Sequence, residues 1–227
     1  MAIADLLDDL FPIRIPAEAA ENLSGFRAWV TSEEFPENWR ASFLRGEILL
    51  DMSPEETETH NKVKWEIGRA ILTLSRILKK GTYYGDGVLL THKKANLSTE
   101  PDGMFVSKDA LRSGRIHRIP RKDRLGEYVE FVGTPDLVVE VVSRSSWKKD
   151  AQDLFDVYYR AGIPEYWLID ALGEEIDFKL LRRGDRKYIP VESQRGWLES
   201  QVFGRRFKLS RARDEDGDWQ YDLKAKK

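Results

Sequence analysis

The length, composition and cysteine content of the chain limit the classes of protein to which it can belong. It has 227 residues, of which 41% are hydrophobic and 11% aromatic, with three His and no Cys. This composition suits one globular domain with a substantial core. Disulfides and thiolate metal sites are excluded. Asp, Glu and His are the ligands left for a metal ion, and this set suits Mg²⁺ or Mn²⁺.

The charge of the chain is nearly balanced, because 37 basic and 39 acidic residues give a formal net charge of −2. Any nucleic-acid partner must therefore be held by a local patch. No window approaches the roughly 20 consecutive apolar residues of a membrane helix. The N-terminal residues mix acids and Arg14 with apolar residues, unlike a secretory signal. We expect a cytoplasmic protein without a membrane partner.

Weak helical patterns and one hairpin pattern open the chain. The helical patterns cover residues 3–11 and 17–31 and carry no obvious chemistry, so we expect a helical brace over residues 1–40. Residues 43–52 then alternate around an Arg-Gly turn, which predicts a β-hairpin with Glu47 at the start of its second strand. Glu47 is either an exposed hairpin charge or a site residue.

The best-marked helix start in the sequence follows this hairpin. Ser53 suits the N-cap, Pro54 the first helical position and Glu56 a capping box. Apolar residues then recur at steps of three and four up to a glycine stop at Gly81, which predicts a helix packed on a sheet. His60 lies on the inward face of an early turn. It is either a structural hydrogen-bond partner or a site residue.

Three strands are predicted next, at residues 82–84, 88–92 and 103–107. Asp102 stands at the entrance of the third. Carboxylates at strand ends commonly reach a ligand in open α/β sheets. The alternative is an Asx turn, because Pro-Asp-Gly is also typical turn composition.

The one strongly basic stretch covers residues 111–124 and is expected to form a loop. Such a loop can neutralise several phosphates and so contribute salt-sensitive affinity for nucleic acid. A solvated charge run is the equal alternative. The residues expected to bind nucleic acid are Arg112, Arg115, Arg118, Arg121 and Lys122.

A strand, a helix and a strand make one unbroken unit over residues 134–170. The first strand, 136–142, is an apolar, β-branched run typical of a buried strand, yet Glu140 stands in its middle. A carboxylate is rarely buried without a cation, a metal or hydrogen-bond donors, unless it borders a wet cleft. The second strand, 165–170, follows a helical stripe closely, which predicts a right-handed parallel crossover.

The C-terminal part is predicted to contain short strands and then a tail. Residues 173–210 have the turn spacing of a β-meander, and residues 211–227 are so highly charged that we expect an extended tail. A single domain would thus cover residues 1–210, with its core at 41–172.

Several of these segments resemble one nuclease family. PDLVVEVVS, a following KxD and YRAGIPEYWLID form a specific central motif, and RGEILLDMSPEETETHNKV and PDGMFVS are weaker flanking ones. Together they resemble the Uma-type (DUF820) putative restriction endonucleases of the PD-(D/E)xK superfamily. The resemblance runs from about Leu44 to Gly204 and implies an α/β restriction-endonuclease-like core, a central mixed sheet flanked by helices, and metal-dependent phosphodiester hydrolysis.

The resemblance also implies roles for individual residues. Asp102 matches the metal-binding aspartate, and Glu140 matches the acidic residue of the (D/E)xK element. Glu47 and His60 match family positions near the site.

The lysine of the motif is displaced in this chain. The superfamily lysine would fall at Val142, and the helix position that aligns with the family lysine is Leu154. Lys149 or Lys148, at the start of the helix, is expected to supply the missing cation.

The sequence therefore predicts an endonuclease that uses Mg²⁺ or Mn²⁺ and acts on nucleic acid, with DNA as the expected substrate. A homodimer is one expected assembly. Two alternatives stay open. One is a catalytically inactive nuclease fold that binds nucleic acid or another partner. The other is a metal-dependent phosphoesterase that acts on a small substrate.

Overall fold

Three β-sheets organise the computed structural model, which describes residues 15–36, 39–121, 126–144 and 153–227. The first has the order β2 (Glu47–Asp51), β1 (Arg40–Leu44), β5 (Leu97–Thr99), β4 (Leu89–His92), β8 (Tyr128–Gly133), β7 (Ile116–Pro120). The second has the order β12 (Tyr188–Pro190), β11 (Asp177–Arg183), β10 (Glu165–Asp170), β9 (Leu137–Val141), β6 (Gly103–Ser107), β3 (Gly81–Gly85). The third has the order β13 (Leu198–Ser200), β14 (Arg205–Arg213), β15 (Trp219–Lys226).

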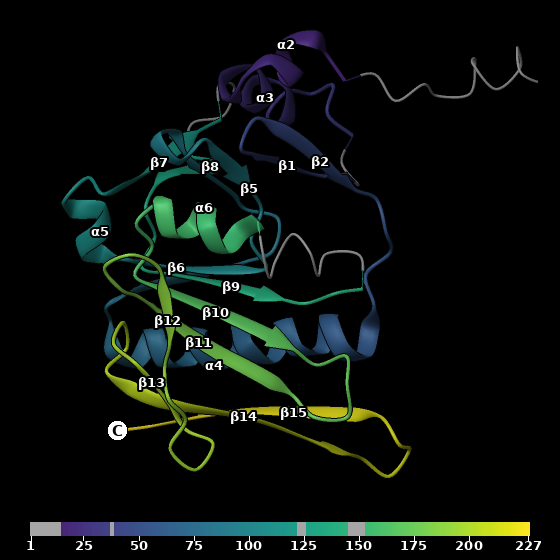
Figure 1. The fold of residues 1–227 in the computed structure, drawn as a ribbon, viewed down its shortest axis with the longest axis vertical. Helices are drawn as coiled ribbons and strands as arrows, with labels where there is room; N and C mark the ends of the chain where they lie inside the picture. Colours follow the sequence, from purple (N-terminus) through teal and green to yellow (C-terminus); the bar gives the residue numbers. More distant parts are fainter. Residues whose placement is uncertain (1–14, 37–38, 122–125, 145–152) are drawn as a thin grey trace, which may run out of the picture.

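Few helices accompany these sheets. Those described are α2 (Ala17–Glu21), α3 (Leu23–Val30), the π-helical turn η1 (Thr57–Asn61), α4 (Lys62–Leu78), the short 3₁₀ turn η2 (Lys93–Ala95), α5 (Lys108–Arg112) and α6 (Leu154–Arg160). Figure 1 shows α2 and α3 at one end of the molecule, beside β1 and β2, and the hairpin of β14 and β15 at the other. The predicted class, a mixed α/β fold with flanking helices, is confirmed.

The central unit has the predicted form. β9 pairs in parallel with β10, and Glu140 lies beside Leu168 in their register. β6 runs antiparallel on the other side of β9, so the sheet is mixed. Alternation along β9 sends Val138 to the α6 face and Val139 to the α4 face, and both faces are buried. This burial explains the nearly continuous apolar run around Glu140.

The N-terminal brace is fixed to the first sheet by an ion pair. Arg27 of α3 donates through Nε and Nη2 to the two carboxylate oxygens of Glu130 on β8, each at 2.7 Å. Glu130 is only 2% exposed. A bidentate guanidinium pair satisfies such a buried carboxylate well. The helix predicted at residues 3–11 lies outside the described residues.

Replacing Arg27 by Ala is expected to destabilise the protein by about 3 kcal/mol, because it leaves the buried carboxylate of Glu130 uncompensated. Urea unfolding measures this change. The double change Arg27→Met with Glu130→Leu removes both charges and should recover most of the loss. A single variant as stable as the wild type would contradict the account.

The start of the long helix differs from the prediction. Glu56 is the N-cap, and its carboxylate accepts the N–H groups of Glu58 and Thr59 at 2.9 and 2.5 Å. Ser53 donates its hydroxyl to Asp51 instead of capping the helix. The prediction that Ser53 caps the helix is therefore wrong, because its hydroxyl binds Asp51 and the ionised carboxylate of Glu56 accepts the first N–H groups in charge-assisted hydrogen bonds.

The predicted C-terminal tail is also wrong. Residues 211–227 belong largely to β14 and β15, which pair over eight positions. Phe207 and Leu223 are buried on the inner face of this hairpin, while Arg206, Lys208, Lys224 and Lys226 alternate to the opposite face. The domain boundary predicted at residue 210 thus falls inside β14.

The basic stretch is not a loop over its described part. Its first residues end α5, and positions 116–120 form β7. Arg115, between them, donates to the carbonyl groups of Thr134 and Pro135 and to the carboxylate of Asp136. Arg115 therefore links two segments of the fold.

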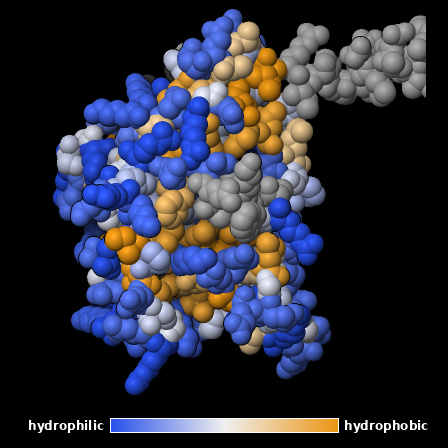
Figure 2. All heavy atoms as spheres, viewed as in Figure 1, coloured by the Kyte–Doolittle hydropathy of each residue, from blue (hydrophilic) through white to orange (hydrophobic). Residues whose placement is uncertain are grey.

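The surface of the molecule is mainly hydrophilic in the view of Figure 2, with hydrophobic residues at the upper right, near the N-terminal helices, and in further groups below the middle of the view. None of the described helices combines the length and the apolar character that a membrane crossing requires.

Candidate active site

A cleft of about 450 Å³ lies between the β1–β2 hairpin, the start of β6 and the end of β9. Its basic lining residues, among those described, are Arg40 and His60. Its carboxylates are Glu47, Asp51, Asp86, Glu100, Asp102, Glu140 and Asp153. So many carboxylates repel a phosphate group unless cations neutralise them. Any phosphate chemistry in this cleft therefore requires added positive charge.

Two strands bring Asp102 and Glu140 together. β6 and β9 are antiparallel with Gly103 opposite Val139, and the neighbours of this pair in the chain are Asp102, just before β6, and Glu140, near the end of β9. The carboxylate of Asp102 also accepts the N–H of Val141 at 2.7 Å. Both predicted metal ligands therefore line the same cleft.

Glu140 is buried, at 2% exposure, and is held by a neighbouring helix. Tyr158 of α6 donates its hydroxyl to Glu140 Oε1 at 2.5 Å. A hydrogen bond to a charged carboxylate is among the strong ones and fixes its orientation. Glu140 is thus stabilised in both of the ways expected for a buried carboxylate, because it has a hydrogen-bond donor beside it and it borders the cleft.

His60 lies between two carboxylates. Its Nδ1 is 2.8 Å from Glu55 Oε1, and its Nε2 is 3.5 Å from Asp102 Oδ2. Burial lowers the pKa of His60, but the hydrogen bond and charge of Asp102 and the hydrogen bond with Glu55 outweigh it, so the pKa is raised overall. When the ring is protonated, both of its nitrogens act as donors. His60 is suited to position Asp102 rather than to accept a proton.

Lys64 is the site residue that sequence reasoning missed. Its Nζ is 2.5 Å from Glu55 Oε1, 2.6 Å from Asp86 Oδ2 and 3.5 Å from Asp102 Oδ1. The side chain is only 8% exposed. Burial lowers the pKa of Lys64, but the surrounding carboxylates raise it overall, so the ammonium stays charged. Lys64 follows His60 by four residues, which places both side chains on the same face of a helix. This spacing is the sequence feature that could have indicated Lys64 as a site residue.

These cations keep the neighbouring carboxylates ionised. Burial raises the pKa of Asp102, but His60, Lys64 and the N–H of Val141 lower it overall. For Glu55, hydrogen bonds and charge from Lys64, with help from Asn61 and His60, outweigh burial and lower the pKa to about 2. Both groups are therefore anionic at neutral pH.

The two positions that could have carried the superfamily lysine are apolar and buried. Val142 is 1% exposed and Leu154 is fully buried, and both belong to the core between β9 and α6. Neither can supply a cation. Lys148 and Lys149 lie outside the described residues. Within the described ranges, Lys64 and His60 are the cationic side chains that approach Asp102.

The remaining predicted residues divide into two groups. Glu47, the first residue of β2, lines the cleft. The arginines of the basic stretch do not belong to its lining. Arg118 donates to Tyr84 and lies over Phe131, while Arg112 is largely exposed. Lys122 lies outside the described residues. The nucleic-acid role of the five predicted residues stays a prediction: Arg112, Arg115, Arg118, Arg121 and Lys122.

The donor set at the cleft suits Mg²⁺ or Mn²⁺. Among the described residues, no group of three or more Asp, Glu and His side chains could hold a metal ion by itself. Mg²⁺ is usually bound through one or two carboxylates together with waters and substrate phosphates. Asp102 and Glu140 meet this requirement with hard oxygen ligands. The residues present therefore fit a hydrated magnesium-type ion.

Comparison with known proteins identifies the family. The model of the Uma2 family, described as "Putative restriction endonuclease", matches residues 25–212. The chain belongs to the Uma2 family. The matched region contains β1 to β13, most of β14 and the whole described cleft. The expected family membership is thus confirmed.

A solved structure agrees with the Uma2 assignment at the level of the fold. It is described as a putative nuclease belonging to DUF820 from Anabaena variabilis, and it is 18% identical, with a TM-score of 0.54. The similarity covers 72% of this chain and 83% of that one. The comparison with curated proteins finds no match.

Proposed function

We propose that this Uma2-family chain is a divalent-metal-dependent endonuclease, and that the cleft around Asp102 and Glu140 is its catalytic centre. The observation that carries the proposal is that these two carboxylates, from the neighbouring ends of β6 and β9, line one acidic cleft. Membership of a family described as restriction endonucleases supports the proposed class of reaction. DNA is the proposed substrate. A homodimer stays a prediction.

The metal would be held by Asp102 and Glu140. When bound, Mg²⁺ or Mn²⁺ lowers the pKa of a coordinated water and neutralises charge on the phosphate. Two carboxylates close together repel each other, which favours binding of a cation between them. Tyr158 and the N–H of Val141 orient the two carboxylates toward this task.

Lys64 supplies fixed positive charge at this centre. Its ammonium lies 3.5 Å from Asp102 Oδ1, and its side chain is only 8% exposed. A preorganised cation in a poorly hydrated site stabilises negative charge that develops on a phosphate. His60 contributes by holding Asp102 from the other side. In this proposal Lys64 takes the place of the superfamily lysine, and Lys149 is the alternative donor of that charge.

Cleavage of supercoiled plasmid DNA tests the proposed function. We expect nicked and linear products with Mg²⁺ or Mn²⁺ and none with EDTA. Asp102→Asn should lose this activity, because it removes one metal ligand. Binding of the plasmid without any cleavage under all metal conditions would contradict the proposal.

One observation favours a second candidate function, a nuclease fold that binds nucleic acid without cutting it. Both expected lysine positions, Val142 and Leu154, are filled by core residues. The buried ammonium of Lys64 beside Asp102 favours the catalytic alternative. The plasmid assay separates the two.

A further inference from the structure

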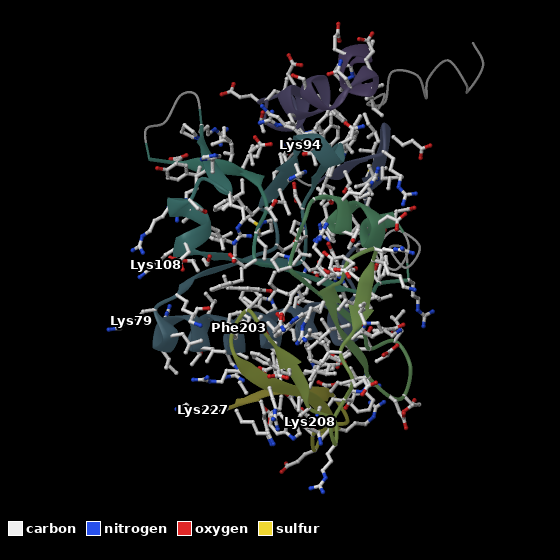
Figure 3. The ribbon with its side chains drawn as sticks, turned by 60° about the vertical axis from the view of Figure 1, so that its left-hand side comes forward. Lys79, Lys94, Lys108, Phe203, Lys208 and Lys227 are labelled. Carbon is white, nitrogen blue, oxygen red and sulfur yellow. The ribbon has the colours of Figure 1, made fainter. Side chains whose placement is uncertain are left out.

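Cations gather on the outer face of the third sheet, which is turned away from the core. Alternation along the strands sends Phe207 and Leu223 inward, where both are buried. Figure 3 shows Lys208 and Lys227 at this end of the molecule. The cations on the outward side of β14 and β15, called the basic face below, are Arg206, Lys208, Lys224 and Lys226.

Like charges face each other directly on the basic face. Arg206 lies opposite Lys226, and Lys208 lies opposite Lys224. Like charges in directly opposed cross-strand positions destabilise a sheet. The hairpin is therefore less stable than it would be with neutral residues at these positions, unless an anion binds there.

The protein itself compensates little of this charge. Lys224 pairs with Asp222 at 3.2 Å. Within the described ranges, Arg206, Lys208 and Lys226 form no ion pair, although Glu199 stands opposite Arg206 on β13. The Lys226 ammonium instead lies 3.9 Å from the ring centre of Trp197. The face is thus net positive on a chain whose net charge is −2.

Protection of a sheet edge does not explain these cations. Lysines often protect an exposed edge strand from pairing with other chains. The edge of β15 is already covered by α4 and η1, because Glu66 accepts the N–H of Leu223 at 2.7 Å and Glu58 accepts that of Trp219 at 3.1 Å. Arg206 and Lys208 moreover lie on the central strand of the sheet.

We propose that the basic face binds the phosphate backbone of nucleic acid, as a contact separate from the catalytic cleft. Lys and Arg neutralise phosphates and release their counterions, which gives salt-dependent affinity. The acidic lining of the cleft supplies little of this attraction, so the affinity has to come from another surface. The choice of nucleic acid as the polyanion rests on the proposed function.

Fluorescence anisotropy with a labelled DNA duplex of about 30 base pairs tests this contact over a series of salt concentrations. EDTA is present, so cleavage plays no part. The triple variant Arg206→Gln, Lys208→Gln, Lys226→Gln should bind at least about 10-fold more weakly. The slope of log K against log salt should become shallower by about 2 to 3. Its Tm should equal or exceed that of the wild type, because opposed like charges are removed.

A matched control changes three exposed lysines elsewhere, Lys93, Lys94 and Lys108, to Gln and should bind DNA like the wild type. Figure 3 shows Lys94 and Lys108 away from Lys208. Unchanged DNA affinity of the triple variant would overturn the proposal, as would binding to anionic vesicles but not to DNA. Weakened binding by the triple variant supports it even if the wild type cuts no DNA, in which case the proposed function alone fails.

Discussion

Replacing Glu140 by Gln is expected to lower metal-dependent DNA cleavage at least about 100-fold while the fold stays intact. The change removes the charge of one proposed metal ligand. Gln has the same shape, and its carbonyl oxygen can still accept the Tyr158 hydroxyl that now binds Glu140 at 2.5 Å. Burial of an unpaired charge is also avoided. Plasmid cleavage rates and thermal unfolding, measured on the same preparation, check both parts.

Tyr158→Phe provides a graded comparison for this variant. It removes the hydroxyl that orients Glu140 but leaves the carboxylate. Its loss of cleavage should be smaller than that of Glu140→Gln, and Mn²⁺ should still bind. Wild-type cleavage by Glu140→Gln would remove Glu140 from the catalytic centre.

Replacing Lys64 by Met is expected to lower the rate of DNA cleavage and to raise the affinity for Mn²⁺. Cleavage should fall about 100-fold, because a fixed charge beside Asp102 is lost. Mn²⁺ affinity should rise several-fold, because Asp102 loses a competing cation. Stability without metal should fall by about 2 kcal/mol, since Glu55, Asp86 and Asp102 lose their shared partner.

Calorimetric Mn²⁺ titration and single-turnover cleavage separate this role from a purely structural one. A structural role alone would lower both metal affinity and cleavage. Lys62→Ala is the matched control, because Lys62 lies on the same helix and pairs only with Glu58, at 2.7 Å, among the described residues. Its effects should stay within about 0.5 kcal/mol. If Lys149→Ala abolishes cleavage and Lys64→Met does not, Lys149 supplies the charge.

The central unit could be predicted from the sequence because its signals are local. β6 and β10 have the predicted bounds, and the apolar run of β9 indicated burial on both faces. Asp102 and Glu140 followed from their positions at a strand start and within that run. The hairpin of β1 and β2 could also be predicted, because Gly46 marks a tight turn between two alternating segments. In the structure, Arg45 and Gly46 both have the positive φ that such a turn requires.

The rest depended on contacts between distant segments. The environment of Lys64 combines Glu55 with Asp86 and Asp102, which come from separate loops. In β14 and β15, the many charges concealed a strand pattern whose apolar side becomes clear only when Phe207 and Leu223 meet the core. Neither the surroundings of Lys64 nor the burial of β14 and β15 can be predicted from the spacing of residues within one segment.

A crystal soaked in Mn²⁺ shows whether Asp102 and Glu140 hold a divalent metal. We expect an anomalous peak within bonding distance of both carboxylates, and its loss in Glu140→Gln crystals. A peak elsewhere, with the ammonium of Lys64 or Lys149 bridging the two carboxylates instead, would contradict this expectation.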